Sequence, residues 1–256
     1  MKTKLIILGC GNSMGTPRID GYWGNCNSKN KKNIRTRCSA IILKGGNSIL
    51  IDTSPDIKNQ LVKNNIKNIS AVLYSHEHSD QTNGLFELRP FYIKYKKKIN
   101  VYATTKTMKH IIKRNDFCFK SYSGYGAIVK PHIIKKNFAL GNSKQIVNFK
   151  SLQVKHGLIM NTAYVFEKTA YINDCNDMSI IKMKELKNLN NLVIDCLRIE
   201  KHPSHFNLEE SIYIHNKLKP QKTFLTNLHQ DLDYNFLTRR LPKNVFPAYD
   251  GLKINL

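Results

Sequence analysis

The chain has 256 residues, 41% of them hydrophobic, which is enough to bury a substantial core and excludes a disordered tail. Its formal net charge of +23 would attract phosphates, RNA or acidic metabolites, but the lysines are dispersed along the chain and select no partner by themselves. No apolar run approaches a membrane span, residues 5–8 are too short for a signal-peptide core, and six scattered cysteines suit reduced thiols, so we expect a cytoplasmic protein.

The N-terminal half alternates apolar, β-prone runs with helical patterns. A glycine-rich turn over 9–17 follows the first strand and lacks the glycine spacing of a nucleotide-binding loop. The stretches 18–37 and 116–142 show no clear period, so we expect a long excursion in the first and loop with short strand in the second. In chain order we expect strands at 3–8, 39–43 and 48–52, a helix from Pro55, a strand at 69–74, a helix through Leu85, Leu88, Phe91 and Tyr92, a strand at 99–103, and a helix from 104 or 105 to Arg114.

The C-terminal half continues the same alternation. Asn207-x-x-Glu210 has the spacing of a capping box, and Pro220 ends the helix that it starts. No repeat or linker divides the series, so we expect one domain over 1–256, of the α/β (α+β) class, with two mixed sheets packed together and helices outside. The expected elements are strands at 145–154, 162–166 and 169–172, a helix at 178–186, a strand at 192–195, the helix behind Asn207, a strand at 223–226, a short helix at 236–241, and strands near Val245 and Leu252.

The most informative stretch follows the strand at 69–74. Residues two apart in extended chain face the same side, so His76, His78 and Asp80 can converge just past the strand's end. Imidazole and carboxylate are ligands that zinc accepts, and Asp80 can also cap the helix that follows. Taken alone, the stretch is equally a polar loop that holds two histidines.

Potential ligands also end other predicted strands. His156, Asp174 and His229 each come directly after an apolar run. Four loops from neighbouring strand ends can bring six such groups to one edge of a sheet sandwich, and this recurrence is more specific than any one histidine. Asp52 ends a strand in the same way and would support the site from behind. The remaining histidines, His110, His132 and His215, suit surface or packing roles.

These segments together resemble the metallo-β-lactamase-fold hydrolases, in particular the branch of the phosphoribosyl cyclic phosphate phosphodiesterases. The resemblance implies a four-layer αβ/βα sandwich and a metal-dependent hydrolase. It also implies that His76, His78 and His156 hold one metal. Asp80 and His229 would hold a second, and Asp174 would bridge the two. The segments that carry the resemblance are 8–17, 50–55, His76-x-His78-x-Asp80, His156-Gly157, Asp174 and Thr226-Asn227-Leu228-His229.

The chain departs from this family at Gln81, where members carry a further histidine. An amide oxygen is neutral and a weaker ligand than imidazole. Three states therefore stay open: two metals with a labile second, one metal only, or a changed metal preference. We expect at least one tightly held ion, with zinc ahead of manganese.

The implied reaction is hydrolysis of a phosphodiester, small and cyclic or nucleotide-like, by metal-bound hydroxide. The leaving alkoxide needs a proton, and His205 is the expected donor because it stands just ahead of a helix, as in relatives of this fold. His202 is the alternative donor. We therefore assign catalysis to Asp80 and His205, and the sequence identifies no substrate-binding residue.

Two further functions compete with this one. The positive charge would suit an RNA-processing nuclease of the same fold, although the chain has no evident basic arm for gripping RNA. Loss of a ligand at Gln81 would suit a non-catalytic metal-binding relative. We expect a small anionic phosphodiester as the partner, with RNA second and no membrane, and leave a homodimer open.

Overall fold

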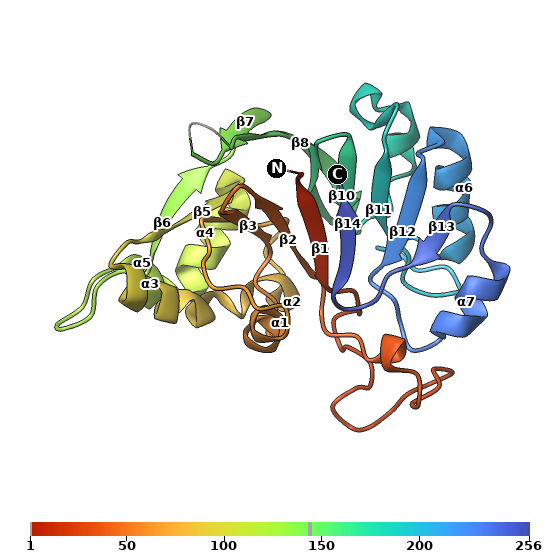
Figure 1. Cartoon of the computed structure of the whole chain (residues 1–256), viewed down its shortest axis with the longest axis horizontal. Helices are drawn as coiled ribbons and strands as arrows, with labels where there is room; N and C mark the ends of the chain where they lie inside the picture. Colours follow the sequence, from red (N-terminus) through yellow and green to blue (C-terminus); the bar gives the residue numbers. More distant parts are fainter. Residues whose placement is uncertain (1, 143–144) are drawn as a thin grey trace.

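A computed structural model describes residues 2–142 and 145–256, and in it two seven-stranded mixed sheets pack against each other (Figure 1). Antiparallel hairpins and parallel pairs occur in both sheets. In spatial order the first sheet consists of β14 (Leu252–Asn255), β1 (Lys4–Gly9), β2 (Ser39–Lys44), β3 (Asn47–Ile51), β4 (Ala71–Leu73), β5 (Ile99–Ala103) and β6 (Val129–Ile133). The second consists of β13 (Val245–Pro247), β12 (Lys222–Thr226), β11 (Asn191–Asp195), β10 (Thr169–Ile172), β9 (Ile159–Phe166), β8 (Val147–His156) and β7 (Asn137–Leu140).

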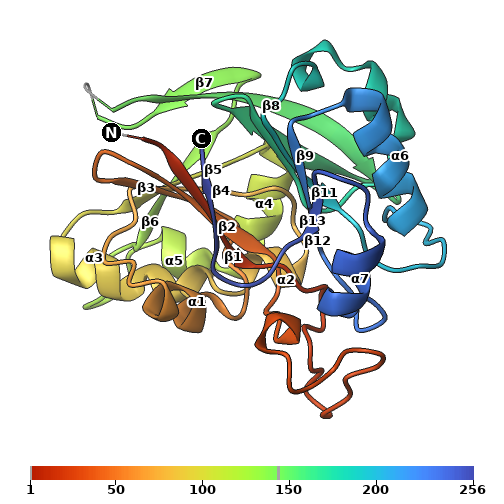
Figure 2. The ribbon, with the colours of Figure 1, turned by 45° about the vertical axis from the view of Figure 1, so that its right-hand side comes forward.

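Helices cover the outer face of each sheet, as Figure 2 shows from a second direction. The first sheet carries α1 (Ile57–Lys63), α2 (Ser79–Thr82), η2 (Leu85–Leu88), α3 (Arg89–Tyr95), α4 (Thr105–Arg114) and α5 (Asp116–Phe119). The second carries η3 (Met178–Lys182), η4 (Lys184–Leu186), α6 (Leu208–Leu218) and α7 (Tyr234–Arg240), while η1 (Lys31–Asn33) lies in the loop between β1 and β2.

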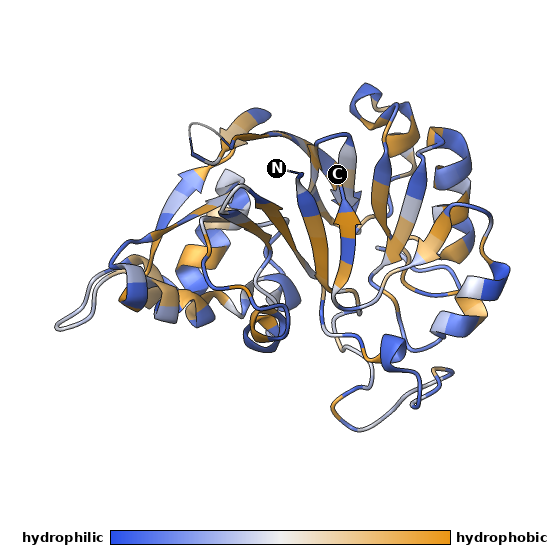
Figure 3. Cartoon of the chain, in the orientation of Figure 1, coloured by the Kyte–Doolittle hydropathy of each residue, from blue (hydrophilic) through white to orange (hydrophobic). Residues whose placement is uncertain are grey.

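Three apolar layers hold this sandwich together, and the strands at its centre are mostly hydrophobic (Figure 3). The middle layer interleaves side chains from both sheets, such as Ile7 and Ile42 from the first and Phe149 and Tyr164 from the second. The outer layers fill the space between each sheet and its helices. A strand such as β4 is therefore buried on both faces, which is why it reads as a continuous apolar run. The expected four-layer architecture is confirmed.

Most expected elements form close to their predicted bounds, and the capping box is complete. Asn207 accepts a hydrogen bond from the Glu210 amide at 2.9 Å, and the Glu210 carboxylate accepts one from the Asn207 amide at 3.0 Å. The six cysteines are free and buried. Within the described residues, no helix combines the length and the apolar character needed to cross a bilayer.

The prediction of a single helix after the His76-x-His78-x-Asp80 motif is wrong in one respect, because this segment divides into α2, η2 and α3. Gly84 sits at the first break, where its amide donates to the Thr53 carbonyl at 2.9 Å. A Cβ added to Gly84 would lie 2.1 Å from the Ser54 carbonyl oxygen, so this close approach fixes the chain against the loop after β3. Pro90, in the first turn of α3, removes an amide at the second break.

Two other stretches also differ from expectation. The single helix expected at 178–186 is two 3₁₀ turns, because Met183 between them is extended, with φ −71° and ψ 119°. The stretch 116–142 contains the short helix α5 as well as β6 and β7. These strands lie at the two sheet edges, where Pro131 is tolerated in β6 because its missing amide faces no further strand.

Candidate metal centre

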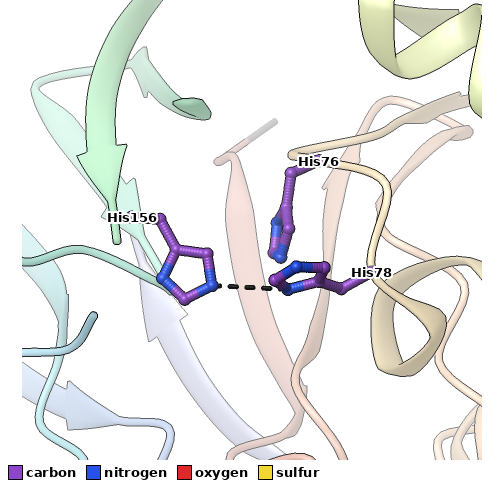
Figure 4. Close-up of side chains that lie close together, drawn as sticks. All are labelled: His76, His78 and His156. Atoms are coloured by element: carbon purple, nitrogen blue, oxygen red, sulfur yellow. Dashed lines mark hydrogen bonds between the residues drawn. The ribbon is translucent and has the colours of Figure 1, made fainter. Parts of the chain in front are cut away.

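Three histidine side chains meet between the two sheets (Figure 4). His76 and His78 come from the loop after β4, and His156 is the last residue of β8. One ring nitrogen from each lies within 4.8 Å of the others, and the His156 Nε2 is 3.3 Å from the His78 Nδ1. The loop and the strand end therefore bring together donors that are 78 positions apart in the sequence.

The orientation of His76 leaves one nitrogen without a protein partner. The Ser75 hydroxyl donates to the Asp52 carboxylate at 2.8 Å, so the His76 Nδ1–H, 3.0 Å away, donates to the Ser75 oxygen. The other ring nitrogen, Nε2, is buried and has no hydrogen-bond partner. A buried acceptor without a partner is costly, and this one faces two other imidazoles. A divalent cation satisfies it, so the donor set fits a metal.

His156 is oriented in a similar way. Its Nδ1 donates to the Ser204 carbonyl at 2.8 Å, which leaves the Nε2 lone pair directed at His78. Burial lowers the pKa of His76 and lowers the pKa of His156 to about 4, and the neighbouring imidazoles add to both shifts. Both rings are therefore neutral at pH 7, which is the form that binds metals.

Asp52 supports this cluster from behind, as its place at the end of β3 suggested. It accepts from the Ser75 amide and hydroxyl, both at 2.8 Å, and from the Asn173 amide at 3.3 Å. Burial raises its pKa to about 7, against the lowering effect of the hydrogen bonds from Ser75. Its φ of 60° is left-handed, a conformation that Asp tolerates better than most residues.

The other expected site residues face the same cavity, which has a volume of about 370 Å³. Asp174 follows β10, Asp80 lies in α2, and His205 and His229 lie in the loops after β11 and β12. Of these, Asp174 and His205 form a second close group with His156, again with potential ligand atoms within 4.8 Å of one another.

Asp80 and His229 line the cavity without joining either close group. Among the described residues, the groups of three potential ligands within 4.8 Å are the two that share His156. The His229 Nδ1 donates to the Asp231 carboxylate at 2.8 Å, and Arg35 holds the His229 carbonyl at 3.2 Å. The excursion at 18–37 thus fixes the loop that carries His229.

The surroundings of His205 favour its protonated form. Its Nδ1 donates to the Asp195 carboxylate at 2.8 Å and lies 3.5 Å from Asp174, which leaves Nε2 available to the cavity. Burial by itself lowers the pKa of His205, but the charges of Asp195 and Asp174 outweigh it and raise the pKa to about 9. His205 is therefore protonated at neutral pH. The His202 ring lies beside it, tilted by 50° with its centroid 5.0 Å away, and the His202 Nδ1 is near the Ser204 hydroxyl.

The sequence did not indicate two residues that contact Asp174 or His205. Asp195, the last residue of β11, is fully buried and accepts from the Cys175 amide as well as from His205. Asn227, just after β12, has a φ of 63° and donates to Asp174 at 3.1 Å and to Asp195 at 3.0 Å. Their position at strand ends was the available signal, because it is the same signal that indicated Asp52 and Asp174.

Gln81 is buried beside the two site carboxylates. Its Nε2 donates to Asp80 at 3.1 Å and to Asp174 at 3.2 Å, and its Oε1 is 3.5 Å from the Asn173 amide nitrogen. The amide therefore presents a donor to the position where a metal ligand was expected to present an acceptor.

The mouth of the cavity is polar. Asn12, Ser13 and Met14 come from the glycine-rich turn after β1, and Arg198 lies on the opposite loop with its guanidinium held by the Glu200 and Lys201 carbonyls. The turn is joined to the loop after β12 by a bridge between Gly11 and Leu228. The glycine-rich segment therefore belongs to the site as well as being a tight turn.

Two of the histidines expected to be structural, His132 and His215, have ordinary partners. His132 stacks on Tyr102 and lies 2.9 Å from the Asn100 side-chain oxygen. His215 is 2.9 Å from the Thr223 hydroxyl.

This fold and this histidine cluster agree with the comparison with known families. Residues 47–227 match the family described as the beta-lactamase superfamily domain, and the chain belongs to that family. Its fold is the metallo-β-lactamase fold.

Several solved structures resemble this chain over nearly its whole length. A structure described as a new diphosphatase from the PhnP family superposes with a TM-score of 0.88 at 31% identity, covering 100% of this chain and 98% of that one. Zinc-bound PqqB from Methylobacterium extorquens has a TM-score of 0.74 at 18% identity, covering 99% and 100%. The short form of human tRNase Z has a TM-score of 0.69 at 15% identity, covering 98% of each chain. The last two likenesses show the fold alone.

A curated relative is much longer than this chain. It is an octanoyltransferase of Porphyromonas gingivalis, 30% identical over 255 residues, and the match covers 98% of this chain but only 51% of the relative. The chain thus spans about half the length of that protein.

Proposed function

We propose that this protein is a metal-dependent hydrolase that cleaves a phosphodiester, small and cyclic or nucleotide-like. The observation that carries the proposal is the group of three histidines, in which the buried Nε2 of His76 has no protein partner. A likeness of 31% identity over the whole chain to a diphosphatase supports a substrate with phosphorus at its reacting centre.

The histidines His76, His78 and His156 would hold a divalent ion, with zinc ahead of manganese. When bound, such an ion supplies an activated water and stabilises charge on phosphoryl oxygens. The protein holds the ligands in place from behind: Ser75 and Asp52 orient His76, and the Ser204 carbonyl orients His156. The Asp80 carboxylate faces the same cavity and would orient the attacking water.

His205 would deliver the proton that the leaving alkoxide needs. Its Nδ1 is bonded to Asp195, so the transferable proton is the one on Nε2, toward the cavity. The ring also lies beside the three-histidine group, with its centroid 4.6 Å from that of His156. Asp195 fixes the tautomer and the orientation of His205, as an orienting carboxylate does in other His-based sites. His202 stays the alternative donor.

The cavity favours a small substrate. Its volume of about 370 Å³ lies at the lower end of the range for small-molecule sites, roughly 300–1,000 Å³. Arg198 at the mouth supplies a cation for an anionic group. An RNA-processing nuclease on the same fold is the second candidate, and the charge of +23 is the observation that favours it.

A substrate panel tests the proposal. Metal-free protein is reconstituted with zinc or manganese and assayed on cyclic phosphodiesters, linear nucleotide phosphodiesters, a diphosphate ester and a precursor tRNA. We expect turnover of a small diester that depends on added metal and changes little with salt. Cleavage confined to precursor tRNA, with a steep salt dependence, would favour the nuclease. Protein that retains no metal after chelator-free purification and binds none on addition would contradict both.

A further inference from the structure

We infer that this site holds one metal ion, and that Gln81 keeps a second ion out by donating hydrogen bonds to the carboxylates that would bind it. The inference rests on the proposed metal-dependent function and selects one of the three states that the sequence left open. It assigns Gln81 a positioning role as a donor in place of the role of a weak ligand.

The orientation of the Gln81 amide follows from its neighbours. The Nε2 of Gln81 faces carboxylate oxygens of Asp80 and Asp174, at 3.1 and 3.2 Å, and a carboxylate oxygen accepts from an amide N–H. Its oxygen faces the Asn173 amide nitrogen at 3.5 Å, which is a donor. Rotating the amide to present its oxygen as a ligand would place that oxygen against the carboxylate oxygens. It would also place the Gln81 nitrogen against the Asn173 side-chain nitrogen.

Asp174, the expected bridging ligand, has both oxygens engaged by amides. Its Oδ2 accepts from Gln81 at 3.2 Å, and its Oδ1 accepts from Asn227 at 3.1 Å. Asn227 is itself fixed, because the same nitrogen donates to the buried Asp195 at 3.0 Å. A second ion would have to share the Asp174 carboxylate with these two amide donors, on a side chain that is 3% exposed.

The remaining expected ligands do not compensate for this loss. Neither Asp80 nor His229 belongs to a three-ligand group within 4.8 Å among the described residues. The three-histidine group is the opposite case, because a bound ion there satisfies a nitrogen that the protein leaves without a partner.

Metal stoichiometry tests the inference independently of activity. The full-length chain is stripped of metal, reconstituted with excess Zn²⁺ or Mn²⁺, desalted, and measured by elemental analysis and native mass spectrometry. We expect one ion per chain for the natural protein and two for Gln81→His, which adds an imidazole and removes the donor. Gln221→His is the matched control, because Gln221 is exposed, stands just before β12 and does not line the cavity, and this variant should stay at one ion.

A second variant covers the case in which Gln81→His does not fold. Gln81→Glu keeps the side-chain size but places a third carboxylate beside Asp80 and Asp174, so it should take up a second ion and gain more thermal stability from added metal than the natural protein does.

The outcomes separate the two claims. Two ions in the natural protein would overturn the inference and leave the metal-dependent function intact, whereas no ion in any variant would overturn the function. One ion in the natural protein and still one in both folded Gln81 variants would show that Gln81 is not what excludes the second ion, and would overturn its role.

Discussion

The two halves of the cavity differ in whether the protein supplies hydrogen-bond donors to the potential metal ligands. On one side, His76, His78 and His156 present ring nitrogens to a common point, and the protein leaves one of those nitrogens without a partner. On the other side, the acceptors of Asp174 are filled by amide donors from Gln81 and Asn227. Lone pairs without donors attract a cation, and carboxylates already supplied with donors attract it less. The ligand types alone would not have separated the two halves.

The largest effect should come from removing a histidine of the first half. His156→Ala deletes a ligand, and we expect metal affinity to fall by more than about 100-fold, since losing an outer-shell partner alone costs 10–100-fold. Hydrolysis should fall to the uncatalysed level at micromolar metal. Competition with a chelator of known affinity measures the change. His132→Ala, a histidine outside the cavity, should keep both affinity and activity.

A substitution on the side of Asp174 and His205 should lower turnover and leave metal binding unchanged. His205→Gln removes the proton donor without removing a metal ligand, so we expect turnover to fall by about 10²–10⁴-fold. Metal content should stay unchanged. Steady-state kinetics and elemental analysis on the same preparation test this, and loss of metal together with activity would show that the two halves are not separate. If His202→Gln gives the large effect instead, the acid is His202.

A smaller effect should follow from Asp195→Asn, which keeps an oxygen to accept from the His205 Nδ1 but removes the charge. Without that charge the pKa of His205 should fall, by about 1–3 pKa units for a close carboxylate. The acid works only when protonated, so activity is lost as pH rises through its pKa, and in the variant this loss should begin at lower pH. An unshifted alkaline limb in the pH–rate profile would contradict the role given to Asp195.

The smallest effect should come from the support behind the first half. Ser75→Ala removes the hydroxyl between Asp52 and His76, and we expect metal affinity to fall by roughly 10–100-fold. Turnover at saturating metal should stay close to that of the natural protein, because no proton-transfer group is touched. Ser79→Ala changes an exposed serine at the start of α2 and is the control.

Much of the fold follows from local pattern. The strand at 99–103 and the helix after Thr104 form as expected because their signals, an apolar run and a side-chain cap, act within a few residues. The break at Gly84 could not be predicted, since it depends on a contact with the loop after β3. The short edge strands around Pro131 have no strong pattern of their own and are held by one neighbour each.

The sequence by itself determined which residue types stand at the strand ends, because an apolar run followed by His or Asp is visible without any structure. Only the tertiary structure decided which of those groups meet. His156 reaches His78 because the two sheets pack with these ends on one edge, and His205 reaches Asp195 because the loop after β11 turns back to the end of that strand. It also decided that Gln81 acts as a donor, because the orientation of an amide is set by the hydrogen-bonding groups around it, and Asp174 and Asn173 come from a segment far from Gln81 in the chain.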